Sequence, residues 1–186
     1  MSRIPGLAAR LADRRPALVN EPNRPQAAVA VILTPDPDSV LLIRRADREG
    51  DRWSGQLAFP GGRWSAGDAG LLDTVRRETR EEVGVELDPG TLIGTLDDLA
   101  PRTSVLPPIL VRPFVFAPSS RQTLDLSPEV ALAWWLPLDT LTSPGVYGPV
   151  EFARYGTLVR TMGYRLDAGI LWGMSERILT PLVKLL

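Results

Sequence analysis

Two residue types are missing from this chain of 186 residues: it contains no cysteine and no histidine. Without cysteine the chain has no disulfides, no zinc–thiolate site and no thiol nucleophile. Without histidine it has no serine–histidine–aspartate triad, and it lacks the commonest side chain of acid–base catalysis and transition-metal binding. Any enzymatic chemistry must therefore use carboxylates, arginines, hydroxyl groups and a hard cation that prefers oxygen ligands.

The sequence also lacks a charge excess and a long apolar run. The formal net charge is −1 at pH 7, which gives no bulk attraction for nucleic acid or an anionic membrane. No apolar run reaches the roughly 18 residues of a membrane span, and the first residues show no apolar signal-peptide core. We expect a cytoplasmic protein, a monomer or a homodimer, with no nucleic-acid or membrane partner.

Interleaved strand and helix patterns predict an α/β domain over residues 27–186, preceded by an N-terminal helix and connector over residues 1–26. The predicted strands, the last of them ambiguous with a helix, are 27–33, 40–43, 91–99, 109–116 and 129–136. The predicted helices are 7–14, 68–83 and 168–186. Asp68 is the expected N-cap of the central helix, Gly84 its stop, and residues 143–149 are expected to be a loop.

Carboxylates gather on the central predicted helix. At about 100° per residue, Glu82 falls inside the apolar arc of this helix, Glu78 at its edge and Glu81 further round. Such a cluster is often only a solvated helix face. Here two carboxylates one turn apart beside the apolar stripe repel each other, and burying either one is costly. A divalent cation removes both penalties, so the pattern indicates a site for Mg²⁺ or Mn²⁺.

The same residues resemble the signature of the Nudix hydrolase family, G-x5-E-x7-R-E-U-x-E-E-x-G-U, where U is a bulky aliphatic residue. Gly62 opens the signature, and the run Arg77-Glu78-Thr79-Arg80-Glu81-Glu82-Val83-Gly84-Val85 closes it. The sequence departs from the signature in Asp68 for the first Glu, in one extra residue before Arg77, and in Thr79 for an aliphatic. The resemblance implies a Nudix α/β/α sandwich with a mixed central sheet, and hydrolysis of a diphosphate bond.

A second resemblance is to the Nudix subgroup of coenzyme A diphosphatases. It is carried by Leu41-Leu42-Ile43-Arg44-Arg45, Arg52, Gly55 and Phe59-Pro60-Gly61-Gly62. The downstream segments Ser127-Pro128-Glu129-Val130, Trp135-Leu136-Pro137-Leu138 and Ile170-Leu171-Trp172-Gly173-Met174 are also similar, so that the likeness covers roughly residues 27–182. The interval from Arg45 to Gly55 is one residue longer than expected, and Trp53-Ser54 stands where His is common.

The resemblance implies a role for each of several residues. Glu78 and Glu82 are the expected metal ligands, with Glu81 and the Gly61 carbonyl completing the set, because a Gly-Gly turn lets the backbone approach an ion closely. Arg77 would orient the glutamates or simply pair with Glu81. Glu129 is the candidate base, and its alternative is an exposed loop glutamate.

The substrate is expected to be a nucleoside diphosphate linked to a second group. Coenzyme A is favoured, giving adenosine 3′,5′-bisphosphate and (acyl-)4′-phosphopantetheine; the alternatives are ADP-ribose, dinucleoside polyphosphates or nucleoside triphosphates. A nucleotide-sensing module without activity is the alternative from another class, and the intact glutamates argue against it. Several arginines are expected to bind the phosphates: Arg44, Arg45, Arg52 and Arg63, with Arg48 beside them. The alternative for each one is an ordinary solvated surface charge. The aromatic residues that can stack on adenine or pack in the core are Trp53, Trp64 and Tyr164.

Overall fold

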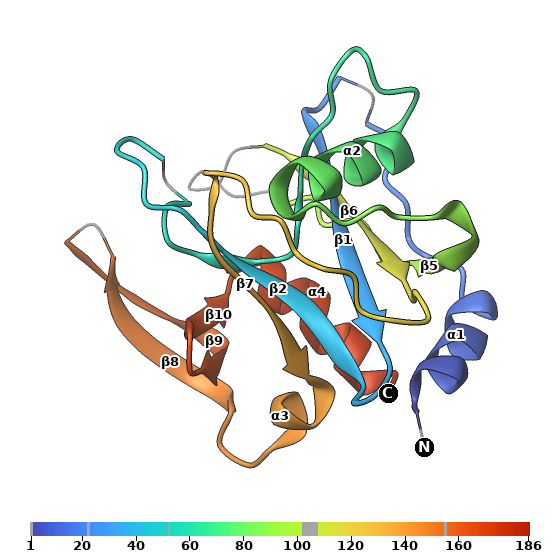
Figure 1. The fold of residues 1–186 in the computed structure, drawn as a ribbon. Coiled ribbons are helices and arrows are strands. Elements are labelled where there is room, and N and C mark those ends of the chain that lie inside the picture. Colours follow the sequence, from blue (N-terminus) through green and yellow to red (C-terminus); the bar gives the residue numbers. More distant parts are fainter. Residues whose placement is uncertain (1, 22, 52, 102–107, 155) are drawn as a thin grey trace.

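The computed structural model describes residues 2–21, 23–51, 53–101, 108–154 and 156–186 (Figure 1). Its helices are α1 (Ile4–Ala12), α2 (Leu71–Val83), α3 (Leu138–Thr142) and α4 (Met174–Lys184), with a 3-10 turn η1 (Pro89–Thr91). Its strands are β1 (Gln26–Thr34), β2 (Ser39–Arg45), β3 (Leu57–Ala58), β4 (Gly61–Arg63), β5 (Leu92–Thr95), β6 (Leu110–Phe116), β7 (Val130–Pro137), β8 (Tyr147–Arg154), β9 (Thr157–Leu166) and β10 (Gly169–Trp172). Among the described residues no helix combines the length and apolar character needed to cross a membrane.

The main sheet is mixed, as predicted. Its strand order is β3-β2-β1-β6-β5, with β4 also paired to β1 and β7 to β2. Strands β1 and β6 run parallel, with Gln26 beside Leu110 and Ile32 beside Phe116, whereas the remaining pairings between the described strands are antiparallel. The parallel pair needs a long crossover connection, and this connection contains α2.

Helices cover both faces of this sheet because β1 is apolar on both sides. Ala28, Ala30 and Ile32 point to one face and share a core with Val75 of α2. Residues on the other face share a second core with α1 and α4, among them Val31, Leu33, Leu7 and Leu179. Alternate strand residues point to opposite faces, so a continuous apolar run is typical of a strand buried on both sides. The predicted α/β/α sandwich is confirmed (Figure 1).

Helix α2 ends where predicted but begins later. It stops at Gly84, whose φ of 70° is the left-handed conformation that ends helices. Its N-cap is Gly70 and not Asp68. The Asp68 carboxylate instead accepts hydrogen bonds from the Ser65 backbone N–H and the Thr74 hydroxyl, and it pairs with Arg77. The predicted cap is therefore wrong because its carboxylate binds side chains further along the helix.

The C-terminal part of the chain differs most from the prediction. Residues 143–149 do not form a loop throughout, since β8 begins at Tyr147, and the predicted helix 168–186 begins only at Met174. Strands β8, β9 and β10 form a separate antiparallel sheet that the sequence pattern did not indicate. The first helix also begins earlier than predicted, at Ile4, and its Leu7 and Leu11 are buried.

Candidate active site

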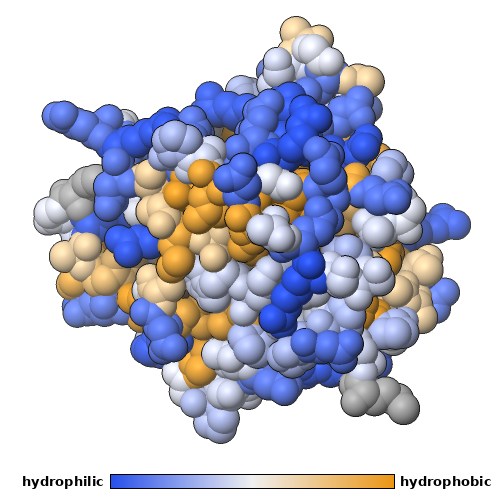
Figure 2. Space-filling model, in the orientation of Figure 1, coloured by the Kyte–Doolittle hydropathy of each residue, from blue (hydrophilic) through white to orange (hydrophobic). Residues whose placement is uncertain are grey.

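The carboxylates of α2 are graded in exposure. Glu82 is 4% exposed, the Glu78 side chain is partly buried, and 54% of the Glu81 side chain is exposed. The helix wheel predicted this order. The surface over α2 is mostly hydrophilic in Figure 2, as expected where Arg80 and Glu81 reach solvent. The buried end of the series lies against β4 and β1.

The Gly61-Gly62 pair gives these carboxylates their space. The Gly61 N–H donates a 2.9 Å hydrogen bond to Glu82 Oε2. Gly61 has a φ of 144°, and a Cβ there would lie 2.2 Å from the Ala28 carbonyl oxygen. A Cβ on Gly62 would lie 2.3 Å from the carboxyl carbon of Glu78. A side chain at either position would displace the strand or the glutamate, so both glycines are required by close approach.

The protonation of Glu82 is strongly perturbed. Burial raises the pKa of this carboxyl to about 7, and the negative charges of Glu78 and Glu129 add to the rise. The Gly61 N–H and the charge of Arg45 work in the opposite direction. Nη1 of Arg45 lies 3.8 Å from Glu82 Oε1, too far for a hydrogen bond. Glu82 is thus a buried carboxylate whose counter-charge, Arg45, lies beyond hydrogen-bond distance.

Arg77 joins the acidic residues of the helix to the loop before it. Its Nη1 donates to Glu78 at 2.8 Å and to Glu81 at 3.1 Å. Its Nε and Nη2 donate to the two oxygens of Asp68 at 2.8 and 2.9 Å. The hydrogen bonds from Arg77 hold the pKa of Asp68 well below its usual range. The guanidinium therefore fixes two helix glutamates from one anchored position.

Glu129 is held beside the C-terminal end of α2. The backbone N–H groups of Asp125 and Ser127 donate to the Val83 and Glu82 carbonyls at 2.9 and 3.0 Å. Glu129 itself, half exposed, pairs with Arg48 at 3.1 Å. It lies near enough to Glu82 for its charge to raise the pKa of that residue. The structure thus brings together two carboxylates that are 47 positions apart in the sequence.

The arginines proposed for phosphate binding differ in their surroundings. Arg45 pairs with Asp51 at 3.2 Å, and Arg44 is half exposed, with Asp47 4.0 Å away. The Arg63 side chain is exposed and has no ion pair within the described part of the chain. Arg52 lies outside the described residues. The expected arginine cluster is thus partly neutralised by acidic residues of its own loop.

Two contributors to this site were missed by sequence reasoning. Asp51 binds Arg45 and accepts the Trp53 N–H at 2.9 Å. Burial favours its neutral form, but these two partners hold the pKa of Asp51 below its ordinary value. The sequence prediction used Gly62 only as the first residue of the signature. In the structure Gly62 lies directly against the Glu78 carboxylate. Within the described residues no three acidic side chains converge as a ready cation cage.

Comparison with known proteins agrees with this architecture. The sequence profile of the NUDIX domain matches residues 24–154, well over half of the chain, and the chain therefore belongs to the NUDIX domain family. With Nudix hydrolases among its relatives, it is an enzyme of that family, a pyrophosphohydrolase.

Two curated relatives illustrate the similarity. An uncharacterized protein of Schizosaccharomyces pombe is 40% identical over 127 residues, covering 66% of this chain and 39% of the yeast protein. The chain thus spans well under half the length of that relative. The uncharacterized Nudix hydrolase NudL of Salmonella paratyphi B is 29% identical over 177 residues, covering 90% of this chain and 86% of NudL.

Solved structures share the fold. A MutT/nudix family protein from Enterococcus faecalis has a TM-score of 0.56 at 17% identity and covers 92% of this chain and 64% of its own. The NUDIX domain of Shewanella oneidensis NrtR, solved with ADP ribose, has a TM-score of 0.51 at 24% identity, over 74% of this chain and 87% of its own. At these identities the likeness extends to the fold alone.

Proposed function

We propose that the protein hydrolyses the diphosphate bond of coenzyme A or an acyl derivative in the presence of Mg²⁺ or Mn²⁺. The products are adenosine 3′,5′-bisphosphate and (acyl-)4′-phosphopantetheine. The proposal that the protein is a hydrolase rests on the carboxylate of Glu82. Burial raises the pKa of this carboxyl to about 7, and the charges of Glu78 and Glu129 contribute. Perturbed carboxyl groups of this kind concentrate at functional sites.

The donor set fits a hard divalent cation. Glu78 and Glu82 offer carboxylate oxygens on one helix face, and the raised pKa of Glu82 means that a nearby positive charge would relieve its ionised form. Glu81 and the Gly61 carbonyl complete the proposed set. Chain groups supply only oxygen, which suits Mg²⁺ or Mn²⁺. The bound cation would supply an activated water and neutralise charge that builds up on the phosphates.

The chain's own residues have separate tasks in this proposal. Glu129 is the candidate base, because it is half exposed and close to Glu82, where it can accept a proton from the attacking water. Arg77 is a positioning residue that keeps Glu78 and Glu81 in place through four hydrogen bonds to three carboxylates. Arg45 holds the loop against the helix through Asp51 and Glu82.

Support for coenzyme A comes from the stretch 41–62 and its location. This stretch carries the subgroup's arginine pattern. Arg45, at the end of β2, lies beside Glu82 of α2, and Arg48, in the loop after β2, pairs with Glu129. Coenzyme A differs from ADP-ribose in its 3′-phosphate, a dianion that calls for an arginine. Arg63 is one candidate, because it is exposed and has no ion pair within the described residues. Arg44, Arg45 and Arg52 remain the other proposed phosphate ligands.

The test compares coenzyme A with 3′-dephospho-coenzyme A, and with ADP-ribose as a third substrate. We expect coenzyme A to have the highest kcat/KM. Arg63→Ala or Arg44→Ala should erase the preference for the 3′-phosphate while sparing the dephospho substrate, a loss of roughly tenfold to hundredfold for one charge-assisted contact. Arg160→Ala, on the second sheet and paired with Glu151, is the control and should retain the preference. Equal rates on both coenzyme A compounds would contradict the proposed contact between an arginine and the 3′-phosphate. Turnover of ADP-ribose alone would contradict coenzyme A as the substrate.

A further inference from the structure

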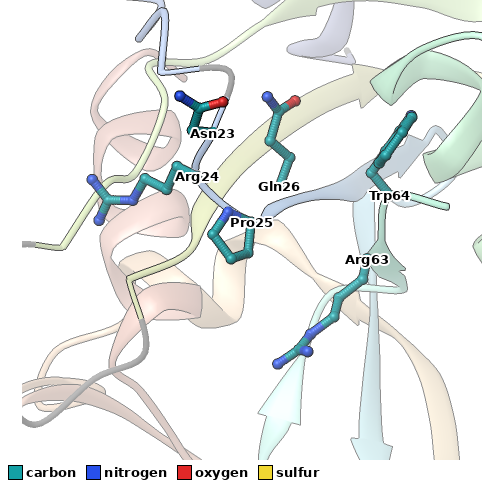
Figure 3. Close-up of a pocket in the computed structure, with 6 residues that line it drawn as sticks. All are labelled: Asn23, Arg24, Pro25, Gln26, Arg63 and Trp64. Atoms are coloured by element: carbon teal, nitrogen blue, oxygen red, sulfur yellow. The ribbon is translucent and has the colours of Figure 1, made fainter. Parts of the chain in front are cut away.

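A pocket of about 570 Å³ lies at the start of β1, beside the end of β4 (Figure 3). The residues that line it are Asn23, Arg24, Pro25, Gln26, Arg63 and Trp64. Figure 3 shows Asn23, Gln26 and Trp64 pointing to one side of the chain and Arg63 to the other. The pocket therefore has one wall formed by an aromatic ring and two carboxamides.

The Trp64 ring is a fixed and accessible platform. Its indole N–H donates to the Asp68 carbonyl at 3.3 Å, and its backbone N–H donates to the Gln26 carbonyl at 2.9 Å. The residue is nevertheless 48% exposed. A large apolar ring held in place at the surface is costly to leave in water, and the flat face of tryptophan suits stacking with a nucleobase.

The two carboxamides beside this platform are available for recognition. Asn23 is exposed and Gln26 is half-buried, and neither side chain makes a hydrogen bond within the part of the chain that the structure describes. A carboxamide offers a donor and an acceptor side by side. This arrangement matches the paired donor and acceptor on the edge of a purine, as when Asn or Gln binds N6 and N7 of adenine.

The platform lies on the same face of the sheet as the acidic helix. Gly62 pairs with Ala28, and both face α2, where Glu78 packs against Gly62. Gln26 is the first residue of β1, and Trp64 directly follows β4. The hydrogen bond from the Trp64 N–H to the Gln26 carbonyl continues the strand pairing, so these two side chains, two residues from Ala28 and Gly62, point to that face as well. Two strand residues span roughly 6.6 Å, a separation that the ribose of a nucleotide can bridge. A base on Trp64 would thus place its first phosphate toward Glu78.

We propose that this pocket binds the purine base of the nucleotide substrate, stacked on Trp64 and read at its edge by Asn23 and Gln26. The proposal rests on the proposed function, because it assigns the base of that substrate to a subsite. Arg24 lines the pocket but is not assigned to binding the base, because its guanidinium already pairs with Glu21 and donates to the Pro101 carbonyl. The pocket thereby selects a purine over a pyrimidine, because a single pyrimidine ring covers less of the indole and cannot span both carboxamides.

The experiment measures binding of AMP, which has no diphosphate bond to cleave, without added metal. Titration calorimetry gives the affinity, and the NMR signal of the Trp64 indole N–H, assigned by its loss in Trp64→Phe, reports the location. We expect AMP to shift that signal and CMP to bind more weakly. Trp64→Ala should weaken AMP binding roughly tenfold to hundredfold, whereas Trp64→Phe should retain most of the affinity.

The carboxamides are tested by Asn23→Ala and Gln26→Leu, with the exposed Asn20→Ala as the matched control outside the pocket. The first two should weaken AMP binding and reduce the preference over CMP, and the control should leave both unchanged. Equal affinity of wild type and Trp64→Ala, an AMP complex that leaves the Trp64 signal unmoved, or no AMP binding at all would overturn the proposal. AMP binding at Trp64 in an enzyme that cleaves no coenzyme A would retain this subsite and remove the proposed substrate instead.

Discussion

The backbone N–H of Gly61 and the carboxylate of Glu82 are joined by a 2.9 Å hydrogen bond between strand β4 and helix α2. This bond is the closest polar contact given to Glu82 by the described residues, because Arg45 remains 3.8 Å away. One neutral donor does not offset the burial of a carboxylate next to two others. The balance leaves the pKa of Glu82 at about 7.

The pH dependence of stability follows from this pKa. With EDTA present, the native protein binds a proton at Glu82 that the unfolded chain has already lost, between the unfolded pKa near 4.5 and the folded pKa near 7. The free energy of unfolding should therefore fall as pH rises through this window, by up to ~3 kcal/mol. Urea unfolding at pH 5, 6, 7 and 8 measures the slope.

Two comparisons isolate Glu82 as the source of that slope. Glu82→Gln should flatten the decline, since an amide does not ionise, and millimolar Mg²⁺ should recover stability above pH 7 in the wild type by binding the native state. A decline of the same size in Glu82→Gln would assign the titration to another group.

Gly62→Ala should damage activity more than folding. The new Cβ would lie 2.3 Å from the Glu78 carboxyl. The flexible Glu78 side chain can rotate away from it at little cost to the stability of the fold. The displaced carboxylate no longer serves the site, so we expect kcat to fall roughly tenfold or more, comparable to losing one charge-assisted contact. Gly67→Ala, where a Cβ meets nothing within 4 Å, is the matched control. Wild-type kcat in Gly62→Ala would show that the position of Glu78 is not needed.

Asp68→Asn tests the anchor of Arg77. The pKa of Asp68 is depressed, chiefly by Arg77, so its ionised form stabilises the fold above the unfolded pKa near 3.8, and this contribution is lost as pH falls. The variant should be less stable than wild type at pH 7, with a difference that shrinks toward pH 2, and its kcat should fall. Asp13→Asn, at an exposed position, is the control. A stability difference that is constant with pH would contradict the charge-based role.

Much of the site's organisation could be predicted from sequence because it depends on helix periodicity. The order of burial of Glu82, Glu78 and Glu81 follows from 100° per residue, and Gly84 ends the helix because glycine adopts a positive φ easily. The contacts of Arg45 with Glu82 and of Arg48 with Glu129 could not be predicted. They depend on the path of a loop, which has no periodic signal.

The second sheet was missed for a related reason. Strand β9 is exposed at Leu158 and Met162 and only half-buried at Val159 and Thr161. An apolar and polar alternation appears in sequence only where one face is buried and the other is in water. Strand β9 carries apolar residues on its exposed positions, so this alternation is weak in its sequence. Gly169 and Gly173, both with positive φ, mark where the expected C-terminal helix is interrupted.

The most direct test of the central claim is the kcat of Glu82→Gln with saturating Mg²⁺, on whichever of coenzyme A and ADP-ribose the wild type cleaves faster. The substitution keeps the shape of the side chain and removes the charge that would hold the cation. We predict a fall of at least ~100-fold, on the scale of losing a main electrostatic element of catalysis, and loss of wild-type turnover in EDTA. Undiminished turnover by Glu82→Gln, or by the wild type in EDTA, would contradict a metal-dependent hydrolysis centred on this carboxylate.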